Sequence, residues 1–273
     1  MPAASRAAWA LPRTTGSNDV TTTTYGYVAG VDYHATPDTL FGFALAGGGS
    51  DWNLAQGFGT GRSDTFQAGV HSCTQFGPAY VSAALAFGNN WFNTNRSALG
   101  DQLQAEFTGQ SYAARAEVGD RYTLPIDGAV LGVTPYAGLQ TQWFRTPAYS
   151  ETDLSGGGLG LAYSAATAND TRSELGARFD DFTTVENRPL ILRARLAWAR
   201  DWTSGTVLNA AFVSLPGASF TVNGAPVPEN AALTTVSAQY WLTPSWSFTA
   251  QIDGAFASTG QSYGGTGTLR YTW

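Results

Sequence analysis

Apolar and polar residues alternate with a period of two over much of the chain. Between positions 246 and 256, one set of alternate residues is Trp246, Phe248, Ala250, Ile252, Gly254 and Phe256, and the intervening set is Ser247, Thr249, Gln251, Asp253 and Ala255. Successive side chains of a β-strand point to opposite faces, so this pattern predicts a strand with one apolar and one polar face. Similar alternation follows Tyr112, Arg172 and Leu190, and no comparable stretch has helical spacing. The chain is therefore predicted to be all-β.

The alternation predicts twelve strands, at residues 6–14, 23–34, 39–48, 64–75, 79–91, 109–122, 133–145, 171–183, 189–202, 231–243, 246–257 and 265–273. The connections between them hold 8, 4, 15, 3, 17, 10, 25, 5, 28, 2 and 7 residues, so longer and shorter connections alternate. Outer-membrane barrels join their strands by short periplasmic turns and longer outer loops. We therefore predict that residues 1–273 form one domain, a closed antiparallel transmembrane β-barrel of about twelve strands. Both chain ends are expected on the side of the short turns.

Segment 208–222 also alternates and could be counted as a further strand. A thirteenth strand would make the count odd, whereas bacterial single-chain barrels have even counts. We therefore place this segment inside the longest outer loop, residues 203–230, as a local hairpin that bends at Pro216-Gly217.

Composition favours a membrane location. Charged residues make up 12% of the chain and aromatic residues 13%, whereas a soluble domain carries about 25% charged residues. All 14 basic residues are Arg, and the 20 acidic residues give a net charge of −6, which argues against a nucleic-acid partner. A soluble sandwich or barrel would also alternate, with its apolar face inward. Against that alternative, aromatic residues gather at predicted strand ends, as interfacial girdles do. These residues are Tyr25, Tyr27, Tyr33, Trp198, Trp202, Trp241, Trp246, Tyr271 and Trp273.

Targeting signals within the sequence are sparse. No apolar run approaches the roughly 18 residues that a membrane-spanning helix needs. From Met1 to Arg13 no apolar stretch follows a basic start, so no signal peptide is expected in this sequence. Because an outer-membrane protein must be exported, we expect the natural precursor to begin upstream of Met1. Cys73 is the single cysteine, which rules out an intrachain disulfide.

Charged residues on the polar faces share the same parity within each predicted strand. In a barrel whose apolar faces point outward, such residues would line a wet lumen. They would form a charge network there and contact a polar segment passing through. The lumen-lining candidates are Asp32, His34, His71, Arg115, Glu117, Arg121, Arg172, Glu174, Arg178, Arg193, Arg195, Asp253 and Arg270.

The sequence offers little catalytic or metal chemistry. His34 and His71 are expected about 10 Å apart on strands 23–34 and 64–75, which is too few and too distant for a metal site. Asp32 shares a face with His34, but no nucleophile motif such as G-x-S-x-G occurs. Asp180 and Asp181 are neighbours in one strand and point to opposite faces, so they cannot form a carboxylate pair. We predict no catalytic residue, no metal and no cofactor.

Two glycine-rich stretches, residues 57–61 and 156–158, look superficially like phosphate-binding loops. Both lack the G-x-x-x-x-G-K-[ST] pattern, and no helix follows either of them. They are therefore predicted to be flexible outer loops.

Several segments, in this order and spacing, resemble the translocator domain of autotransporters, the family of type V secretion. The resemblance covers essentially the whole chain. Its marks are Pro147-Ala-Tyr-Ser-Glu-Thr-Asp153, Thr171-Arg-Ser-Glu-Leu-Gly-Ala-Arg178, Leu196-Ala-Trp-Ala-Arg-Asp-Trp202, Leu215-Pro-Gly-Ala-Ser-Phe-Thr-Val-Asn-Gly224, Ala231-Ala-Leu233 and Gly265-Thr-Gly-Thr-Leu-Arg-Tyr-Thr-Trp273.

The resemblance implies a twelve-stranded barrel in the outer membrane of a Gram-negative bacterium. It implies that the barrel enables export of its own N-terminal passenger and contacts outer-membrane lipid. The family's terminal strand is read by the barrel-assembly machinery, which assigns an assembly signal to Leu269, Tyr271 and Trp273. The chain ends on Trp273 where the family most often has Phe. The linker helix that occupies the pore in the family, and the passenger itself, are not expected within these residues.

Other functions fit an outer-membrane barrel of this size. A barrel enzyme such as a phospholipase or protease would have the same fold, but its catalytic constellation is absent from the sequence. A general porin is disfavoured, because twelve strands enclose a narrow lumen and no long constricting loop is evident. A structural barrel without a transport role stays open as an alternative.

Overall fold

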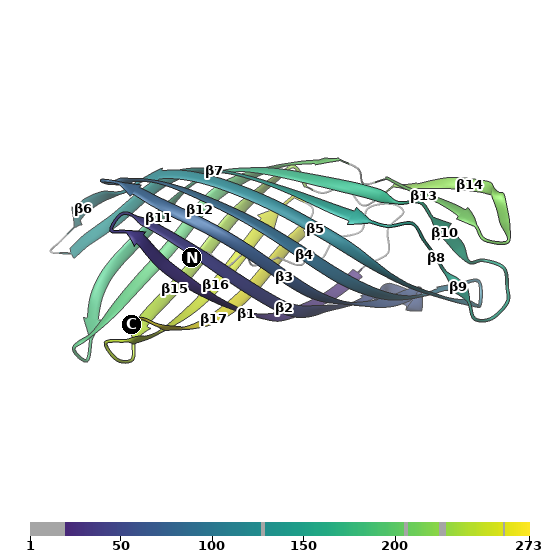
Figure 1. The fold of residues 1–273 in the computed structure, drawn as a ribbon, viewed down its shortest axis with the longest axis horizontal. Coiled ribbons are helices and arrows are strands. Elements are labelled where there is room, and N and C mark those ends of the chain that lie inside the picture. The colour runs from purple at the N-terminus through teal and green to yellow at the C-terminus, as the bar shows by residue number, and fades with distance from the viewer. Residues whose placement is uncertain (1–19, 127–128, 205–206, 224–227, 259) are drawn as a thin grey trace.

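The protein forms a long curled antiparallel sheet (Figure 1). The structure, a computed structural model, describes residues 20–126, 129–204, 207–223, 228–258 and 260–273. The strands that build the wall are β1 (Val20–Thr36), β2 (Thr39–Leu54), β3 (Gly59–Phe76), β4 (Ala79–Ala98), β5 (Asp101–Asp120), β7 (Ala129–Thr146), β11 (Ala166–Val185), β12 (Arg188–Ser204), β15 (Asn230–Trp241), β16 (Trp246–Ala257) and β17 (Gly260–Tyr271). They follow one another in this order across the sheet. In the described residues no helix is long and apolar enough to cross a membrane.

The all-β prediction is confirmed, and each predicted strand from 23–34 onward overlaps one wall strand. The first predicted strand, 6–14, lies outside the described residues. Among those described, β1 and β17 are the two ends of the sheet. Their side chains face one another across the gap, because Arg270 of β17 lies 3.6 Å from Asp32 of β1. Closure of the barrel and the count of twelve strands stay predictions.

The outward face of the wall carries an apolar band. The cross-strand row Val31, Phe43, Val70, Leu85 and Ala114 runs through five neighbouring strands in register. The largest of these side chains are exposed, as Leu85 is at 61%. In water such an exposed apolar surface would be unfavourable. Mid-height outward residues elsewhere on the wall are equally apolar and exposed: Leu139, Leu175, Leu196, Val236 and Ile252.

Two belts of exposed aromatic side chains border this band. The belt near the short turns contains Tyr33, Phe41, Phe76, Phe182, Trp246 and Tyr271. The second belt contains Tyr25, Tyr27, Phe66, Trp91, Trp198, Phe256 and Tyr263. In β16 the belts are ten positions apart, from Trp246 to Phe256. At about 3.4 Å per residue and a tilt of about 40°, that separation is about 26 Å, close to the apolar height of outer-membrane barrels.

The wall strands run further past the second belt than the sequence predicted. Connections of 15 and 17 residues were predicted after 39–48 and 79–91. The structure instead continues β2 to Leu54 and β4 to Ala98, and leaves only residues 55–58 and 99–100 as connections. Alternation fails here because the outward residues become polar, as in the row Thr23, Asp51, Arg62, Asn93 and Glu106. Backbone pairing does not depend on apolar side chains, so the ladder continues.

The turn at residues 99–100 shows how tightly such an extension closes. Leu99 has φ +51° and Gly100 has φ +92°. Positive φ at both central residues is the requirement of a two-residue hairpin turn whose twist matches its strands. Leu99 is 98% exposed, so the side chain contributes nothing to packing at a backbone position that suits Asn or Gly better.

Segment 208–222 does not form a wall strand in the structure. It forms a hairpin of β13 (Val207–Phe212) and β14 (Leu215–Asn223) within the long connection between β12 and β15. The bend lies at Val213-Ser214, not at the predicted Pro216-Gly217, which falls inside β14. β13 also pairs with β10 (Leu161–Tyr163), and β10 pairs with β8 (Tyr149–Ser150). The resulting four-stranded sheet stands at the loop end of the wall, opposite the turns (Figure 1).

The turn end of the wall is simpler. β6 (Tyr122–Ile126) pairs with the start of β7 and lengthens the hairpin there. At the loop end, β9 (Thr152–Asp153) pairs with β5, and a short 3-10 helix (Ala55–Gly57) joins β2 to β3. The C-terminal end lies among the turns, since the Thr272 N–H donates to the Ser245 carbonyl at 2.8 Å. That position agrees with the expected side for this chain end.

Candidate functional site: the charged inner face

The opposite face of the wall carries a cluster of charged side chains around Glu117. Arg178 donates to both carboxylate oxygens of Glu117, at 2.7 and 2.8 Å. Arg115 donates to Glu117 at 2.9 Å and to both oxygens of Glu174, at 2.8 and 3.1 Å. Both carboxylates are buried, Glu117 at 7% and Glu174 at 5% exposure. Two arginines and two glutamates therefore neutralise one another in a single network.

Two tyrosines complete this network. Tyr80 donates to Glu117 at 2.7 Å and accepts a short hydrogen bond from Arg178. Tyr136 donates to Glu174 at 3.3 Å, and its ring lies 4.0 Å beneath the guanidinium carbon of Arg178. A cation over an aromatic face is attracted by the ring quadrupole. The tyrosines therefore orient the Arg178 side chain and stabilise its positive charge.

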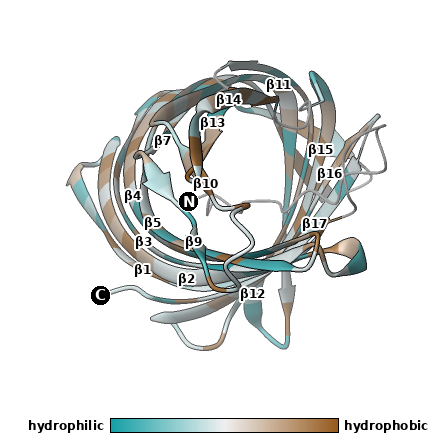
Figure 2. Cartoon of the chain, turned by 90° about the vertical axis from the view of Figure 1, so that its right-hand side faces the viewer, coloured by the Kyte–Doolittle hydropathy of each residue, from teal (hydrophilic) through white to brown (hydrophobic). Residues whose placement is uncertain are grey.

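The wall curls around a concave side (Figure 2), and the contacts of the network across strands place it on that side. Arg178 belongs to β11 and Glu117 to β5, and β7 lies between those strands. Side chains converge on the concave side of a curved sheet and diverge on the convex side, so contacts across an intervening strand favour the concave side. Gly138 of β7, in register with both Glu117 and Glu174, leaves the space for Arg115, because a Cβ there would lie 3.1 Å from its guanidinium.

Further ion pairs lie on the same face. Arg172 donates to Asp201 through two nitrogens at 2.6 and 2.9 Å, and Asp201 is buried. Arg121 reaches Asp180 across β7 with a closest distance of 2.5 Å. Asp180 therefore has an arginine partner, while Asp181 is its neighbour on the other face. From the sequence, Asp180 shares the polar parity of Arg172, Glu174 and Arg178, but it was not among the lumen-lining candidates.

Asp32 is the centre of a smaller group near the two ends of the sheet. Its carboxylate lies 3.4 Å from His71 Nε2 and 3.6 Å from Arg270. Gly42 separates Asp32 from His71 in register, and a Cβ at Gly42 would collide with both side chains. His71 and Asp32 can meet only because position 42 has no side chain.

The remaining lumen candidates are less well paired. Arg193 donates to Gln239 at 2.9 Å. Arg195 lies 3.7 Å from Glu174, and its Nε has no hydrogen-bond partner in the described part of the chain. Asp253 accepts from Thr235 at 2.8 Å and from Gln251. His34 lies on β1 and joins none of the ion pairs found among the described residues.

Sequence reasoning missed several members of this face. Tyr80, Tyr136 and Asp201 were not among the candidates. Asp201 could have been found, because it has the same parity as Arg193 and Arg195 in the same alternating segment. The alternation gave no signal for the tyrosines, and only their position next to inward charges would have marked them as inward. Which arginine meets which carboxylate depends on the stagger between strands, which parity within one strand does not contain.

A second polar cluster fixes the loop end. Glu151 is buried, and Arg96 donates to its two oxygens at 2.9 and 2.6 Å. Asp153 accepts from the backbone N–H groups of Ser155, Gly156 and Gly158. These bonds, with that from Gly158 the largest contribution, hold the pKa of Asp153 below its usual value. The loop at 156–158 therefore hydrogen-bonds to the protein's own carboxylates of Asp101 and Asp153.

The other predicted glycine-rich loop, 57–61, is largely part of the wall. Gly59 to Gly61 belong to β3 and pair with β2 and β4. Gln56 and Gly57 take positive φ, at +61° and +72°, where the chain turns. The described residues hold no group of three or more His, Cys, Asp or Glu side chains arranged to bind a metal ion.

The three residues assigned to the assembly signal lie at the end of β17. Leu269 is 60% exposed and pairs with Phe248 of β16. The rings of Tyr271 and Trp246 lie 5.0 Å apart, and those of Tyr271 and Trp273 lie 6.3 Å apart. The last residues therefore form part of the outward aromatic belt near the turns.

Comparison with known proteins gives this arrangement a family. A sequence model described as the autotransporter β-domain matches residues 7–253. The chain belongs to the autotransporter β-domain family. It is an outer-membrane β-barrel domain of Gram-negative bacteria that serves as the translocator of a passenger. No curated protein matches the sequence significantly.

Solved autotransporter domains share the fold. The translocator domain of autotransporter NalP from Neisseria meningitidis superposes with a TM-score of 0.76 at 15% identity, over 93% of this chain and 83% of that one. The β-domain of the Bordetella autotransporter BrkA gives 0.71 at 18% identity, over 94% of both chains. The transport unit of AIDA-I from Escherichia coli gives 0.64 at 14% identity, over 95% of this chain and 85% of that one.

Proposed function

We propose that the passenger of this translocator crosses the membrane along the concave face, through the lumen that this face would enclose. The contrast between the two faces of the wall carries the proposal. The outward face is apolar between its two aromatic belts, whereas the concave face holds arginines, carboxylates and amides. All thirteen lumen-lining candidates named from the sequence keep this role in the proposal.

The polar side chains of the concave face would form hydrogen bonds, in place of water, with the backbone of a passenger that passes through the lumen. An unsatisfied backbone N–H or C=O in hydrocarbon costs several kcal/mol, so a polypeptide cannot pass through the apolar band itself. Arg193 hydrogen-bonds Gln239 and no described carboxylate, and Arg195 comes no closer than 3.7 Å to Glu174, which leaves donors for a passing carbonyl or carboxylate. A barrel of about twelve strands is narrow, so the chain would pass unfolded or as a single helix.

Two partners complete the proposal. The exposed band between the belts would contact outer-membrane lipid. The terminal aromatic residues Tyr271 and Trp273, with Leu269 outward beside them, would be read by the barrel-assembly machinery during insertion. We further propose that residues 1–273 act as one domain without enzymatic activity, with the passenger attached at the N-terminal side.

Export of a fused passenger tests the route. A short unstructured passenger with an epitope tag is fused ahead of residue 6, and a second version carries two cysteines that close a disulfide loop. The unstructured version should become accessible to protease added outside intact cells. The disulfide version should stall, because a closed loop cannot thread a narrow lumen, and a reductant should restore its export.

Matched controls separate route from insertion. A version with both cysteines replaced by Ser should be exported like the unstructured passenger. Heat-dependent mobility in electrophoresis shows that the barrel itself is folded in each case. A tag that stays periplasmic on a correctly folded barrel would refute the proposed route.

A further inference from the structure

The outward face of β2, β3 and β4 changes from apolar to polar over a few cross-strand rows toward the loop end. The row Leu45, Ala68 and Phe87 is apolar. Two rows further toward the loop end, Asp64 and Trp91 are paired in register, and Tyr25 lies beside them on β1. Trp91 is 50% exposed and belongs to the second aromatic belt. The polar rows that follow therefore stand just outside the apolar band.

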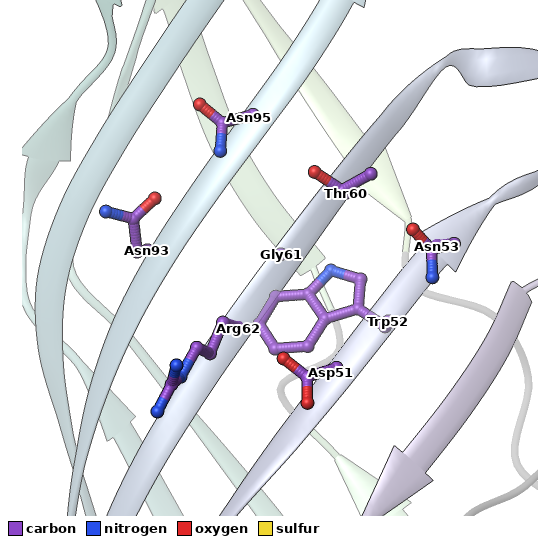
Figure 3. Close-up of a pocket in the computed structure, with 8 residues that line it drawn as sticks. All are labelled: Asp51, Trp52, Asn53, Thr60, Gly61, Arg62, Asn93 and Asn95. Carbon is purple, nitrogen blue, oxygen red and sulfur yellow. The ribbon is translucent and has the colours of Figure 1, made fainter.

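Two of these polar rows border a groove that runs across the strands (Figure 3). Asp51, Arg62 and Asn93 form one row. Asn53, Thr60 and Asn95 form the next. Between the rows lie the backbones of Trp52 and Gly61, whose row has the opposite parity, so its side-chain positions face inward. The cavity has a volume of about 360 Å³.

The height of the groove is set by the pleat. Residues that share a face are two positions apart, which is about 5 Å along the barrel axis in a tilted strand. The groove thus begins about 5 Å beyond the row of Tyr25 and Trp91. With the loop end outside the cell, as short periplasmic turns require, this is the level of the head groups of the outer leaflet.

The groove presents neutral hydrogen-bonding groups. Among the described residues, no side-chain hydrogen bond occupies Asn53, Thr60 or Asn95, and Asn93 donates one to Glu106 at 2.9 Å. Arg62 is the single base in the groove, and Asp64 pairs with it at 2.9 Å. With Asp51 also present, the surface does not favour phosphate. The amide and hydroxyl groups of the groove lie one outward row from the exposed ring of Trp91. Such a combination is suited to sugars, which offer hydroxyls at their edges and C–H groups at their faces.

We propose that this groove, bordered by Asn53, Thr60, Arg62, Asn93 and Asn95, binds the neutral sugars of an outer-leaflet glycolipid. The glycolipid's acyl chains would lie against the apolar rows of the same strands, such as Leu45 and Phe87. Tethering by the acyl chains raises the local concentration of the sugar at the groove. Weak hydrogen bonds from a few amides are then sufficient for specific retention.

The amount of glycolipid that stays bound to the extracted protein tests the proposal directly. The protein is folded into vesicles that contain a glycolipid with a complete sugar chain and is then extracted in mild detergent. Native mass spectrometry gives the fraction of protein that carries bound glycolipid. The wild type should retain the glycolipid about tenfold better than the double variant Asn53→Leu/Asn95→Leu, since two to three hydrogen bonds are lost. Gln261→Leu, an outward polar position on β17 beside Tyr263, is the matched control and should retain it like wild type.

Two further arms identify the ligand. A glycolipid truncated to its acyl-bearing sugars should be retained as poorly by wild type as by the double variant. A free oligosaccharide of the same sequence should bind far more weakly than the glycolipid, and equal binding of the two would overturn the lipid source. Equal retention of the complete glycolipid by wild type and double variant would overturn the site.

Folding of each variant is checked by heat-dependent mobility. If the double variant does not fold, Thr60→Val preserves the side-chain shape and should lower retention about threefold. Passenger export is measured separately in the same variants. Because the groove lies on the outward face, passenger export should be the same in all variants, whether or not they retain less glycolipid.

Discussion

Replacing Glu117 by Ala should lower the free energy of unfolding of the barrel by about 3 kcal/mol, because it leaves two arginines without their shared carboxylate. Glu117 is 7% exposed and accepts hydrogen bonds from Arg115, Arg178 and Tyr80. Removal of one partner from a buried charge network costs more than the network contributes, since the remaining charges stay desolvated. Urea unfolding of the protein in lipid vesicles measures this free energy.

Two other variants make the result specific to the charge. Glu117→Gln keeps the shape and part of the hydrogen bonding, so its loss should be about half as large. The double variant Glu117→Leu/Arg178→Met removes both partners and should recover part of the stability lost in Glu117→Ala. Glu106→Ala, at an exposed carboxylate that accepts one hydrogen bond from Asn93, should change the free energy by less than about 0.5 kcal/mol. A Glu117→Ala variant as stable as Glu106→Ala would contradict the role given to the cluster.

The wall was predictable because its outward face is apolar. Leu175 and Leu196 alternate with Glu174 and Arg195, and that contrast is legible within a single strand. It disappears where the strand leaves the apolar band. Beyond Tyr25 and Trp91 the outward positions become polar, while the inward positions include the aromatic residues Trp52 and Phe92. The contrast that marks the band is lost there, so a continuing strand looks like a loop in the sequence. The predicted loop lengths were therefore wrong at 55–58 and 99–100, while the predicted strands from 23–34 onward each overlap a wall strand that faces the band.

Parity within a strand also predicted which charged residues share a face, but not their contacts. Arg115 and Glu117 are two positions apart, and their contact at 2.9 Å follows from that spacing alone. The contact between Glu117 and Arg178 joins residues 61 positions apart across β7, and it depends on the stagger of three strands. Asp32 and His71 meet only over Gly42, whose importance no single-strand pattern indicates.

The loop end shows a different limit. Glu151 and Asp153 lie in a segment that was noted only for its resemblance to the family. In the structure Glu151 is buried against Arg96, and the Asp153 carboxylate accepts hydrogen bonds from three backbone N–H groups. The glycine-rich residues that looked like a phosphate loop do bind oxyanions, but those of the protein's own aspartates. Backbone N–H groups in such a turn favour negative charge whatever its source.

Arginine at position 252 should reveal the lipid-facing band most sharply. Ile252 is 69% exposed at mid-height of β16, between Trp246 in one belt and Phe256 in the other. A charged side chain at the midplane of an outer-membrane barrel costs about 2–4 kcal/mol. Ile252→Arg should therefore lower the free energy of unfolding in vesicles by that amount.

The neighbouring position provides the matched comparison. Gln251 has the opposite parity and donates to Asp253 at 2.8 Å on the concave face. An Arg at 251 can reach the same carboxylate, so Gln251→Arg should change the free energy of unfolding by less than about 1 kcal/mol. Phe256→Arg, at the belt, should cost less than Ile252→Arg, because the cost of a charge falls to about 0–1 kcal/mol near the interface. Equal losses at 251 and 252 would mean that the two faces of the wall are not divided between lipid and lumen.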